Sequence, residues 1–329
     1  MLTNRTNILK AAADETRLRL LSLLSQGERT VKDMTEILGQ SQPRISRHLK
    51  LLADAHVIER APEGAWVYYR LSDDATVRSI VEPMLAGLAD SDLTIRRDSE
   101  QLERIKQRNQ DAASAYFAAH AEHWDKVRNL HVPDTDIESA ILEAAGPGPF
   151  HALLDIGTGT GRMLELFATR AARATGVDMS PAMLAVARSN LERAGHSHVQ
   201  VRTGDADNLA VVRESFDLVL IHQVLHYLDD PARAIAQAAQ TLMPGGRLLV
   251  IDFAPHSIEE LRASHAHRRL GFSHKQIAQW LSDAGLTPET PTDLPPRDRS
   301  HEALTVSLFP ARATASEKRL GLAGESRIP

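Results

Sequence analysis

The chain has 329 residues, of which 43% are hydrophobic, and this length is sufficient for two domains that each bury a core. It contains no cysteine, which excludes disulfides, thiolate metal ligands and a cysteine nucleophile. No apolar run approaches the roughly 20 residues that span a membrane. The first residues also lack the apolar core of a signal peptide, so we expect a cytoplasmic protein with no membrane partner.

The net charge of −5 is unevenly distributed along the chain. Residues 1–72 carry 11 Lys/Arg and 8 Asp/Glu, a net charge of +3, so the remaining residues carry −8. Residues 37–53 contain no acid, whereas basic side chains are concentrated between positions 44 and 50. This distribution is typical of a short segment that contacts nucleic-acid phosphates.

Residues 8–24 and 31–38 have the apolar spacing of helices, and Gly39 is placed to end the second one. Ser41 is expected to cap a third helix that runs to about residue 55, with Pro43 in its first turn. A short helix, a turn with glycine and a basic helix predict a helix-turn-helix, whose second helix enters the major groove. The residues expected to face DNA are Ser41, Gln42, Arg44, Ser46, Arg47, His48 and Lys50.

Residues 57–60 and 66–71, separated by a Pro-Glu-Gly turn, predict a β-hairpin that serves as a wing. With the preceding helices, this segment resembles the ArsR/SmtB family of winged-helix repressors over residues 7–72. The resemblance implies a DNA operator as partner and a homodimer. Many members sense metals through a Cys-x-Cys pair, and the absence of cysteine excludes that mechanism here.

Residues 73–130 are rich in Ala, Leu, Glu, Arg and Gln and predict a helical bridge, with one or two long helices between residues 92 and 128. The resemblance to family dimers, which pack their terminal helices together, implies a role in dimerisation, and a simple spacer is the alternative. Residues 116–125 resemble the aromatic lid that precedes the first glycine motif in many small-molecule methyltransferases. Packing of these aromatic residues in an ordinary core is the alternative.

Residues 153–161 form an apolar run that ends in Asp155 and three alternating glycines, followed by a helical segment. Such a loop lets a ligand approach the backbone and the N–H groups at the start of the helix. A second strand ends in Asp178, where a ribose diol would bind. The dinucleotide fingerprint requires a glycine at position 162, which is Arg162. The spacing Asp-x-Gly-x-Gly-x-Gly instead resembles motif I of class I S-adenosylmethionine-dependent methyltransferases.

Strand and helix signals alternate from here onwards, so residues 131–310 predict an α/β Rossmann-like, mostly parallel sheet. The predicted fold class is therefore multidomain: a winged helix-turn-helix, a helical bridge and a methyltransferase domain. Residues 311–329 are expected to form a disordered tail. The resemblance implies S-adenosylmethionine or S-adenosylhomocysteine as ligand. Its expected contacts are Asp155, Gly157, Thr158, Gly159, Gly161, Asp178, Met179, Asp205, Ala206 and His222.

The methyl acceptor cannot be identified from a motif, because no Asn-Pro-Pro-Tyr-type sequence follows the strand at residues 216–221. His222, His226 and His256 are candidate bases, since imidazole titrates near neutral pH. A metal site formed by His256, His265 and His267 is a further alternative. Two functions therefore remain open: a regulator that senses the adenosyl ligand, and an active methyltransferase with an autoregulatory DNA-binding head.

Overall fold

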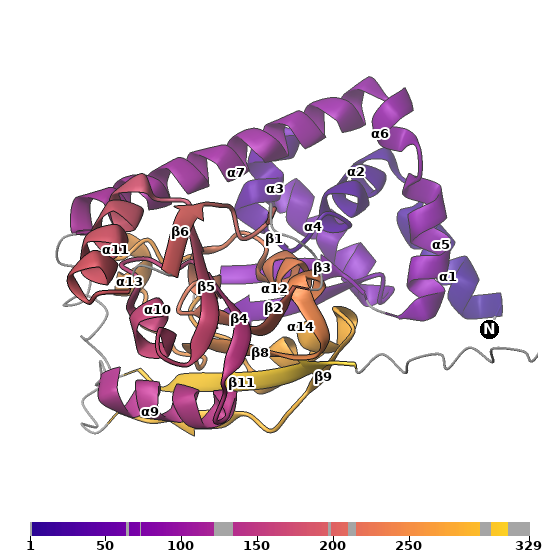
Figure 1. The fold of residues 1–329 in the computed structure, drawn as a ribbon. Helices are drawn as coiled ribbons and strands as arrows, with labels where there is room; N and C mark the ends of the chain where they lie inside the picture. The colour runs from indigo at the N-terminus through magenta and orange to yellow at the C-terminus, as the bar shows by residue number, and fades with distance from the viewer. Residues whose placement is uncertain are drawn as a thin grey trace, which may run out of the picture.

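The computed structural model describes residues 2–63, 66–72, 74–121, 134–196, 199–209, 215–296 and 304–314. The N-terminal region contains four helices and a small antiparallel sheet of strand order β1-β3-β2 within these residues. We call this region, residues 2–72, the head (Figure 1). Its elements are α1 (Leu2–Ala12), α2 (Glu15–Leu24), β1 (Arg29–Thr30), α3 (Val31–Leu38), α4 (Gln42–Asp54), β2 (Ile58–Glu63) and β3 (Trp66–Leu71).

The helix-turn-helix expected from the sequence is formed by α3 and α4. Thr30 and Asp33 form a capping box that begins α3, and Gly39 ends it in the left-handed conformation with φ 64°. Ser41 occupies the N-cap position of α4, but its side chain makes no capping hydrogen bond, contrary to the expectation. Pro43 lies in the first turn of α4, as predicted. The hairpin β2–β3 forms the wing.

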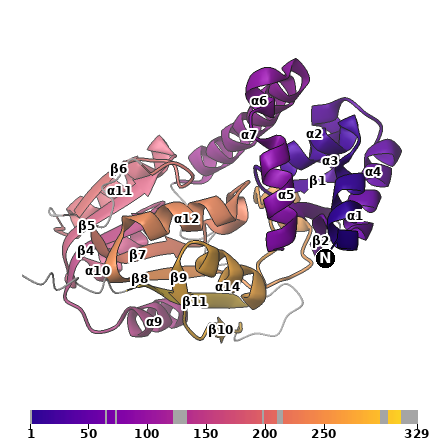
Figure 2. The same ribbon diagram turned by 90° about the vertical axis from the view of Figure 1, so that its right-hand side faces the viewer.

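Three helices follow the head, and the longest of them lies between the head and the C-terminal region (Figure 2). They are α5 (Ala75–Leu85), α6 (Leu88–Ser91) and α7 (Leu93–His120). Val77 and Val81 of α5 and Leu102 and Ile105 of α7 are buried in the same apolar cluster as the head helices. The helical segment expected as a bridge is therefore continuous with the core of the head.

The C-terminal region is built on a mixed sheet with the strand order β10-β11-β8-β7-β4-β5-β6 in the described residues, and β9 pairs with β11. Strands β4 to β8 run parallel to one another, and β11 runs antiparallel to β8. The strands are β4 (Phe150–Ile156), β5 (Ala171–Asp178), β6 (Val199–Thr203), β7 (Phe216–His222), β8 (Leu242–Phe253), β9 (Leu286–Pro288), β10 (Thr292–Leu294) and β11 (Val306–Ala313).

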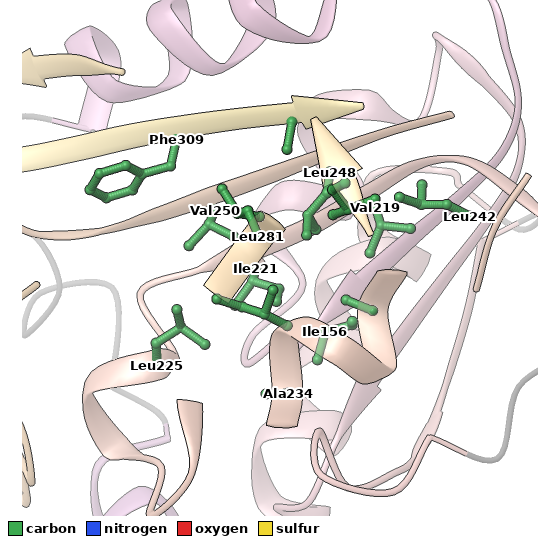
Figure 3. Close-up of a cluster of buried hydrophobic side chains, with 14 of the residues drawn as sticks. Ile156, Val219, Ile221, Leu225, Ala234, Leu242, Leu248, Val250, Leu281 and Phe309 are labelled. Atoms are coloured by element: carbon green, nitrogen blue, oxygen red, sulfur yellow. The ribbon is translucent and has the colours of Figure 1, made fainter. Parts of the chain in front are cut away.

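Helices cover both faces of this sheet, which confirms the predicted Rossmann-like class. They are α9 (Asp134–Ala145), α10 (Arg162–Phe167), α11 (Pro181–Arg193), η2 (Leu225–Tyr227), α12 (Pro231–Thr241), α13 (Glu260–Ser264) and α14 (His274–Asp283). Because side chains alternate along a strand, Leu154 and Ile156 of β4 join the core under α12 and α14, whereas Leu153 joins the core on the opposite face. Figure 3 shows the first of these cores, with Val219, Ile221, Leu248 and Val250 among its labelled residues.

The strand order places a topological switch between β4 and β7. The chain passes from β4 to β5 and β6 on one side and then returns to β7 on the other side of β4. Ligands of such sheets bind outside the carboxyl ends of the strands at this point. One boundary of the sequence analysis is wrong: β11 extends to Ala313, three residues into the segment expected to be a disordered tail, because it pairs with β8 and β9. Residues 315–329 lie outside the described residues.

Candidate functional site

A cavity lies at the topological switch and contains nine of the ten residues predicted to bind the adenosyl ligand. The exception is Gly161, which caps α10 with φ 86° and lies where a Cβ would be 3.2 Å from that of Ala187. The absence of a side chain at Gly161 therefore allows α10 to pack closely against α11. The nine that line the cavity are Asp155, Gly157, Thr158, Gly159, Asp178, Met179, Asp205, Ala206 and His222.

The glycine loop is held between β5 and the exit of β7. The backbone N–H groups of Gly157 and Thr158 donate to the carbonyl of Val177, at 2.8 and 3.0 Å. Asp155 is buried and accepts a hydrogen bond of 2.6 Å from the Thr158 hydroxyl. A Cβ on Gly157 would lie 2.3 Å from Val224, and its φ is 71°. The glycine is thus required for the close approach of the loop to β7.

Asp178 lies at the end of β5 with its carboxylate inside the cavity. One oxygen accepts from the backbone N–H of Gly159 at 2.9 Å and the other from that of Ser180 at 2.8 Å. A carboxylate has about four acceptor sites, so it can accept two further hydrogen bonds, as many as a ribose diol donates. Burial raises the pKa of Asp178, and the hydrogen bonds from Ser180 and Gly159 partly offset this effect.

Arg162 occupies the position where a dinucleotide site requires glycine. Its guanidinium donates two hydrogen bonds to Glu138 of α9, at 2.7 and 2.8 Å, and one to Glu165 at 3.2 Å. The bonds to Glu138 raise the pKa of Arg162 above its ordinary value. The side chain of Arg162 also lines the cavity. An ion-paired arginine therefore occupies the place where a dinucleotide would approach a glycine. This arrangement favours the methyltransferase interpretation of the loop.

The sequence analysis did not assign several further residues of the cavity. Lys106 and Asn109 reach it from α7, while Asp229 and Arg268 reach it from segments beyond β7 and β8. Nothing in the local sequence identifies them, because tertiary packing alone brings them to the loop. Phe117 belongs to the proposed aromatic lid and also lines the cavity. The later part of that segment, residues 122–125, lies outside the described residues.

The three candidate bases occupy different environments. His222 lines the cavity. His226 is buried, and its Nδ1 lies 2.7 Å from a carboxylate oxygen of Asp252. His256 lies against Phe253, outside the residues that line the cavity. Among the described residues no group of three or more His, Cys, Asp or Glu side chains is arranged to hold a metal ion, so the histidine metal site is not supported.

The predicted DNA-binding residues lie on α4. Six of the seven are exposed, namely Ser41, Gln42, Arg44, Ser46, Arg47 and Lys50. His48 is half-buried, and its Nδ1 lies 3.5 Å from a carboxylate oxygen of Asp14. The exposed face therefore presents three cations in the first two and a half turns of α4. Exposed cations on one helix face are typical of a surface that contacts phosphates, and the absence of acids from residues 37–53 agrees with this interpretation.

Two family models match separate parts of the chain. One, described as "Bacterial regulatory protein, arsR family", matches residues 14–60, and the other, "Methyltransferase domain", matches residues 154–250. The ubiquinone biosynthesis O-methyltransferase of Xanthomonas axonopodis pv. citri is 30% identical over 194 residues, which cover 53% of this chain and 79% of that protein. The chain is an ArsR-family regulatory domain fused to a methyltransferase domain.

The ArsR-type head is also similar to the arsenical resistance operon repressor of Escherichia coli K12, with 50% identity over 66 residues that cover 20% of this chain and 56% of that protein. Other curated relatives are matched over 48% to 65% of their own length. The methyltransferase domain has the fold of the N-methyltransferase NodS from Bradyrhizobium japonicum WM9, solved with S-adenosylhomocysteine. The TM-score is 0.50 at 22% identity, covering 61% of this chain and 98% of that one.

No helix within the described ranges has both the length and the apolar character needed to cross a membrane. The two family models and the similar folds confirm the predicted combination of an ArsR-type head with a methyltransferase domain. The head and the methyltransferase domain are in direct contact, through α7 and through the outer face of the wing.

Proposed function

We propose that this protein is a DNA-binding transcriptional regulator whose operator affinity is set by S-adenosylmethionine or S-adenosylhomocysteine bound in the methyltransferase domain. The observation that carries the proposal is the double use of α7. Leu102 and Ile105 belong to the core of the head, whereas Lys106, Asn109 and Phe117 line the cavity of the methyltransferase domain. A ligand in the cavity would thus contact a helix that is part of the DNA-binding unit.

Charged contacts fix α7 to the helices of the head. Arg19 of α2 donates two hydrogen bonds to the buried carboxylate of Asp98, at 2.6 and 2.7 Å. Arg108 of α7 donates to Glu36 of α3 at 2.7 Å. These contacts join α7 to α2 and to the first helix of the helix-turn-helix. A displacement of α7 would therefore be transmitted to the elements that present α4 to DNA.

The chemistry of the cavity supports an adenosyl ligand. Asp178 retains acceptor capacity for two ribose hydroxyls, and the flexible Met179 beside it is 38% exposed and suited to cover an adenine face. Asp205 and Ala206 follow β6 and line the same wall. The glycine loop leaves its backbone accessible for the methionine portion.

The DNA-binding unit that we propose is a homodimer on an inverted repeat, with half-site centres about 34 Å apart. The exposed Leu2 and Leu9 support a partner on α1, because residues seven apart lie on the same helix face. In this arrangement the exposed cations of α4 contact phosphates and base edges.

Titration of an operator with the wild-type protein tests the proposal directly. We expect saturating S-adenosylmethionine or S-adenosylhomocysteine to change operator affinity by about 5- to 150-fold. By thermodynamic reciprocity, saturating operator must change the affinity for the ligand by the same factor. Equal operator affinity with and without both ligands would refute the regulatory function.

An active methyltransferase with an autoregulatory head is the second candidate, and the position of His222 favours it. This histidine lies at the exit of β7 and lines the cavity, where it can reach an acceptor beside the donor. Incubation with S-adenosylmethionine labelled on its methyl group and a small-molecule extract tests this activity. Labelled product that forms with wild-type protein and not with His222→Ala is the expected outcome.

A further inference from the structure

Arg268 and Arg269 are neighbours in sequence, but their side chains serve different domains. Arg268 lines the adenosyl cavity. Arg269 is buried between the methyltransferase domain and the head, where it forms an ion pair with Glu28. A smaller cavity between the domains is lined by both arginines together with Glu28 and Tyr68 of the head and Asp229 of the methyltransferase domain. The two arginines thus join the ligand site to the head within one peptide unit.

The ligand side of this connection is the turn that follows β7, residues 223–229. Gln223, Val224, Tyr227, Leu228 and Asp229 all line the adenosyl cavity. Gln223 adopts a φ of 54°, which is uncommon for a residue other than glycine. Val224 packs so tightly against Gly157 of the ligand-binding loop that no Cβ fits there. A ligand that moves the glycine loop must therefore also move this turn.

The same turn holds the two arginines. The carbonyl of His226 accepts hydrogen bonds from the backbone N–H groups of Arg268 at 2.9 Å and of Arg269 at 3.0 Å. The imidazole of His226 is fixed in turn by Asp252 at the end of β8, at 2.7 Å. Asp229 forms an ion pair with the Arg268 guanidinium. The main chain and side chain of residue 268 are thus both tied to residues 226–229.

The head side of the connection is the outer face of the wing. The Arg269 guanidinium lies 3.8 Å from the centre of the Tyr68 ring, and its Nη1 lies 2.8 Å from Glu28. The Tyr68 hydroxyl donates to the carbonyl of Arg268 at 2.9 Å. Arg262 stacks on Trp66 of the same strand at 4.3 Å. The methyltransferase domain therefore contacts Trp66 and Tyr68, which lie on the face of β3 that points away from the core of the head.

We infer that Arg268 and Arg269 are the coupling element that transmits ligand occupancy from the adenosyl cavity to the wing. This inference rests on the proposed function, because it names a contact through which the ligand changes operator affinity, and we expect the full effect to require this contact as well as α7. A ligand that repositions residues 223–229 shifts the backbone that carries both arginines, and the contacts with Tyr68 and Glu28 pass the shift to β3. Wing position and DNA affinity then depend on the ligand.

The test uses two variants of the full-length protein that alter only the head side of the coupling element. Glu28→Gln replaces the charged partner of Arg269, and Tyr68→Phe removes the hydrogen bond to Arg268; neither residue lines the adenosyl cavity. Glu59→Gln is the matched control, because Glu59 pairs with Arg70 inside the wing at 2.6 Å. S-adenosylhomocysteine affinity is measured by calorimetry, and operator affinity by fluorescence anisotropy with and without this ligand.

We expect all three variants to bind S-adenosylhomocysteine within about 2-fold of wild type. The ligand-induced change in operator affinity should fall below about 2-fold in Glu28→Gln and Tyr68→Phe and persist in Glu59→Gln, against about 5- to 150-fold for wild type. If the ligand still changes operator affinity as much in Glu28→Gln and Tyr68→Phe as in wild type, the inference is wrong. It is also wrong if the ligand-induced change is lost in Glu59→Gln together with the other two variants. No ligand effect in the wild-type protein refutes the proposed function instead.

Discussion

Arg269 and Glu28 are 241 residues apart in the sequence, yet their side chains form an ion pair of 2.8 Å between the methyltransferase domain and the head. The side chain of Arg269 is 2% exposed and that of Glu28 is 12% exposed. A buried guanidinium requires a charged or hydrogen-bonded partner, because transfer of an unpaired charge from water is costly. The contact therefore fixes one relative position of the two domains.

Removal of the carboxylate should destabilise the protein. We expect Glu28→Ala to lower the free energy of unfolding by about 3–5 kcal/mol, the usual cost of leaving one member of a buried ion pair without its partner. Denaturation by urea, followed by tryptophan fluorescence, measures this loss. Glu82→Ala is the control, because Glu82 pairs with Arg78 on an exposed face of α5 and should cost less than about 1 kcal/mol. Equal effects would show that the Arg269 pair is not buried in solution.

The cations of α4 should contribute to DNA affinity. Arg44→Ala and Arg47→Ala remove exposed guanidinium groups from the helix expected in the major groove, so both should weaken operator binding. A loss confined to the specific site, of about 1–3 kcal/mol, would indicate a base contact, whereas a uniform loss with a shallower salt dependence would indicate a phosphate contact. Arg193→Ala, at an exposed position in the last turn of α11, makes the same change in charge and serves as the control. Wild-type affinity in both α4 variants would show that the helix assignment is wrong.

Asp178 should carry much of the affinity for the adenosyl ligand. Asp178→Ala removes the carboxylate that faces the cavity, at an expected cost of about 1.5–3 kcal/mol for each charged hydrogen bond to the ribose. Calorimetry with S-adenosylhomocysteine measures this loss, and Asp283→Ala on an exposed turn of α14 is the control. If the Asp178 variant binds the ligand as tightly as wild type does, the ribose is held elsewhere.

The sequence alone predicts the elements whose signals are local. Gly39 ends α3, Pro43 lies in the first turn of α4, and Asp178 ends the second parallel strand, because turn and helix-start residues act on their immediate neighbours. The spacing of the glycine loop likewise identifies the part of the cavity wall that runs from Asp155 to Gly159. Gly161 shows the limit of such a motif: it matches the spacing, but its conformation serves the packing of α10 against α11.

The contacts between the domains have no comparable local signal. Tyr68 reads as an ordinary wing residue, and its pairing with Arg268 and Arg269 depends on how β3 packs against a segment 200 residues later. The pairing of Asp229 with Arg268 likewise arises from tertiary structure. On the outer face of β3, Tyr68 is buried and Trp66 is partly buried, and each of them contacts an arginine of the methyltransferase domain. The aromatic residues Trp66 and Tyr68 on the outer face of this strand are a weak indication of a partner there, but they do not identify it.

Asp207 lines the adenosyl cavity, and the stability that it contributes should depend on pH. Burial, together with the negative charges of Asp205 and Asp230, raises the pKa of Asp207 to about 7, and Arg233 partly opposes this shift. In the unfolded chain the pKa is about 3.9. Between about pH 4 and 7 this carboxyl therefore binds more protons in the folded protein than in the unfolded chain, and its contribution to the free energy of unfolding falls as the pH rises through this range.

Asp207→Asn removes this dependence while keeping the size of the side chain. The variant should gain stability relative to wild type as the pH rises from about 4.5 to 8, by about 3 kcal/mol, the free energy that corresponds to the part of the pKa shift titrated in this range. Urea denaturation at both pH values measures the difference, and Asp283→Asn, which replaces an exposed carboxylate of α14, is the control. A gain that is the same at both pH values, or larger at pH 4.5, would mean that Asp207 titrates with an ordinary pKa in the folded protein.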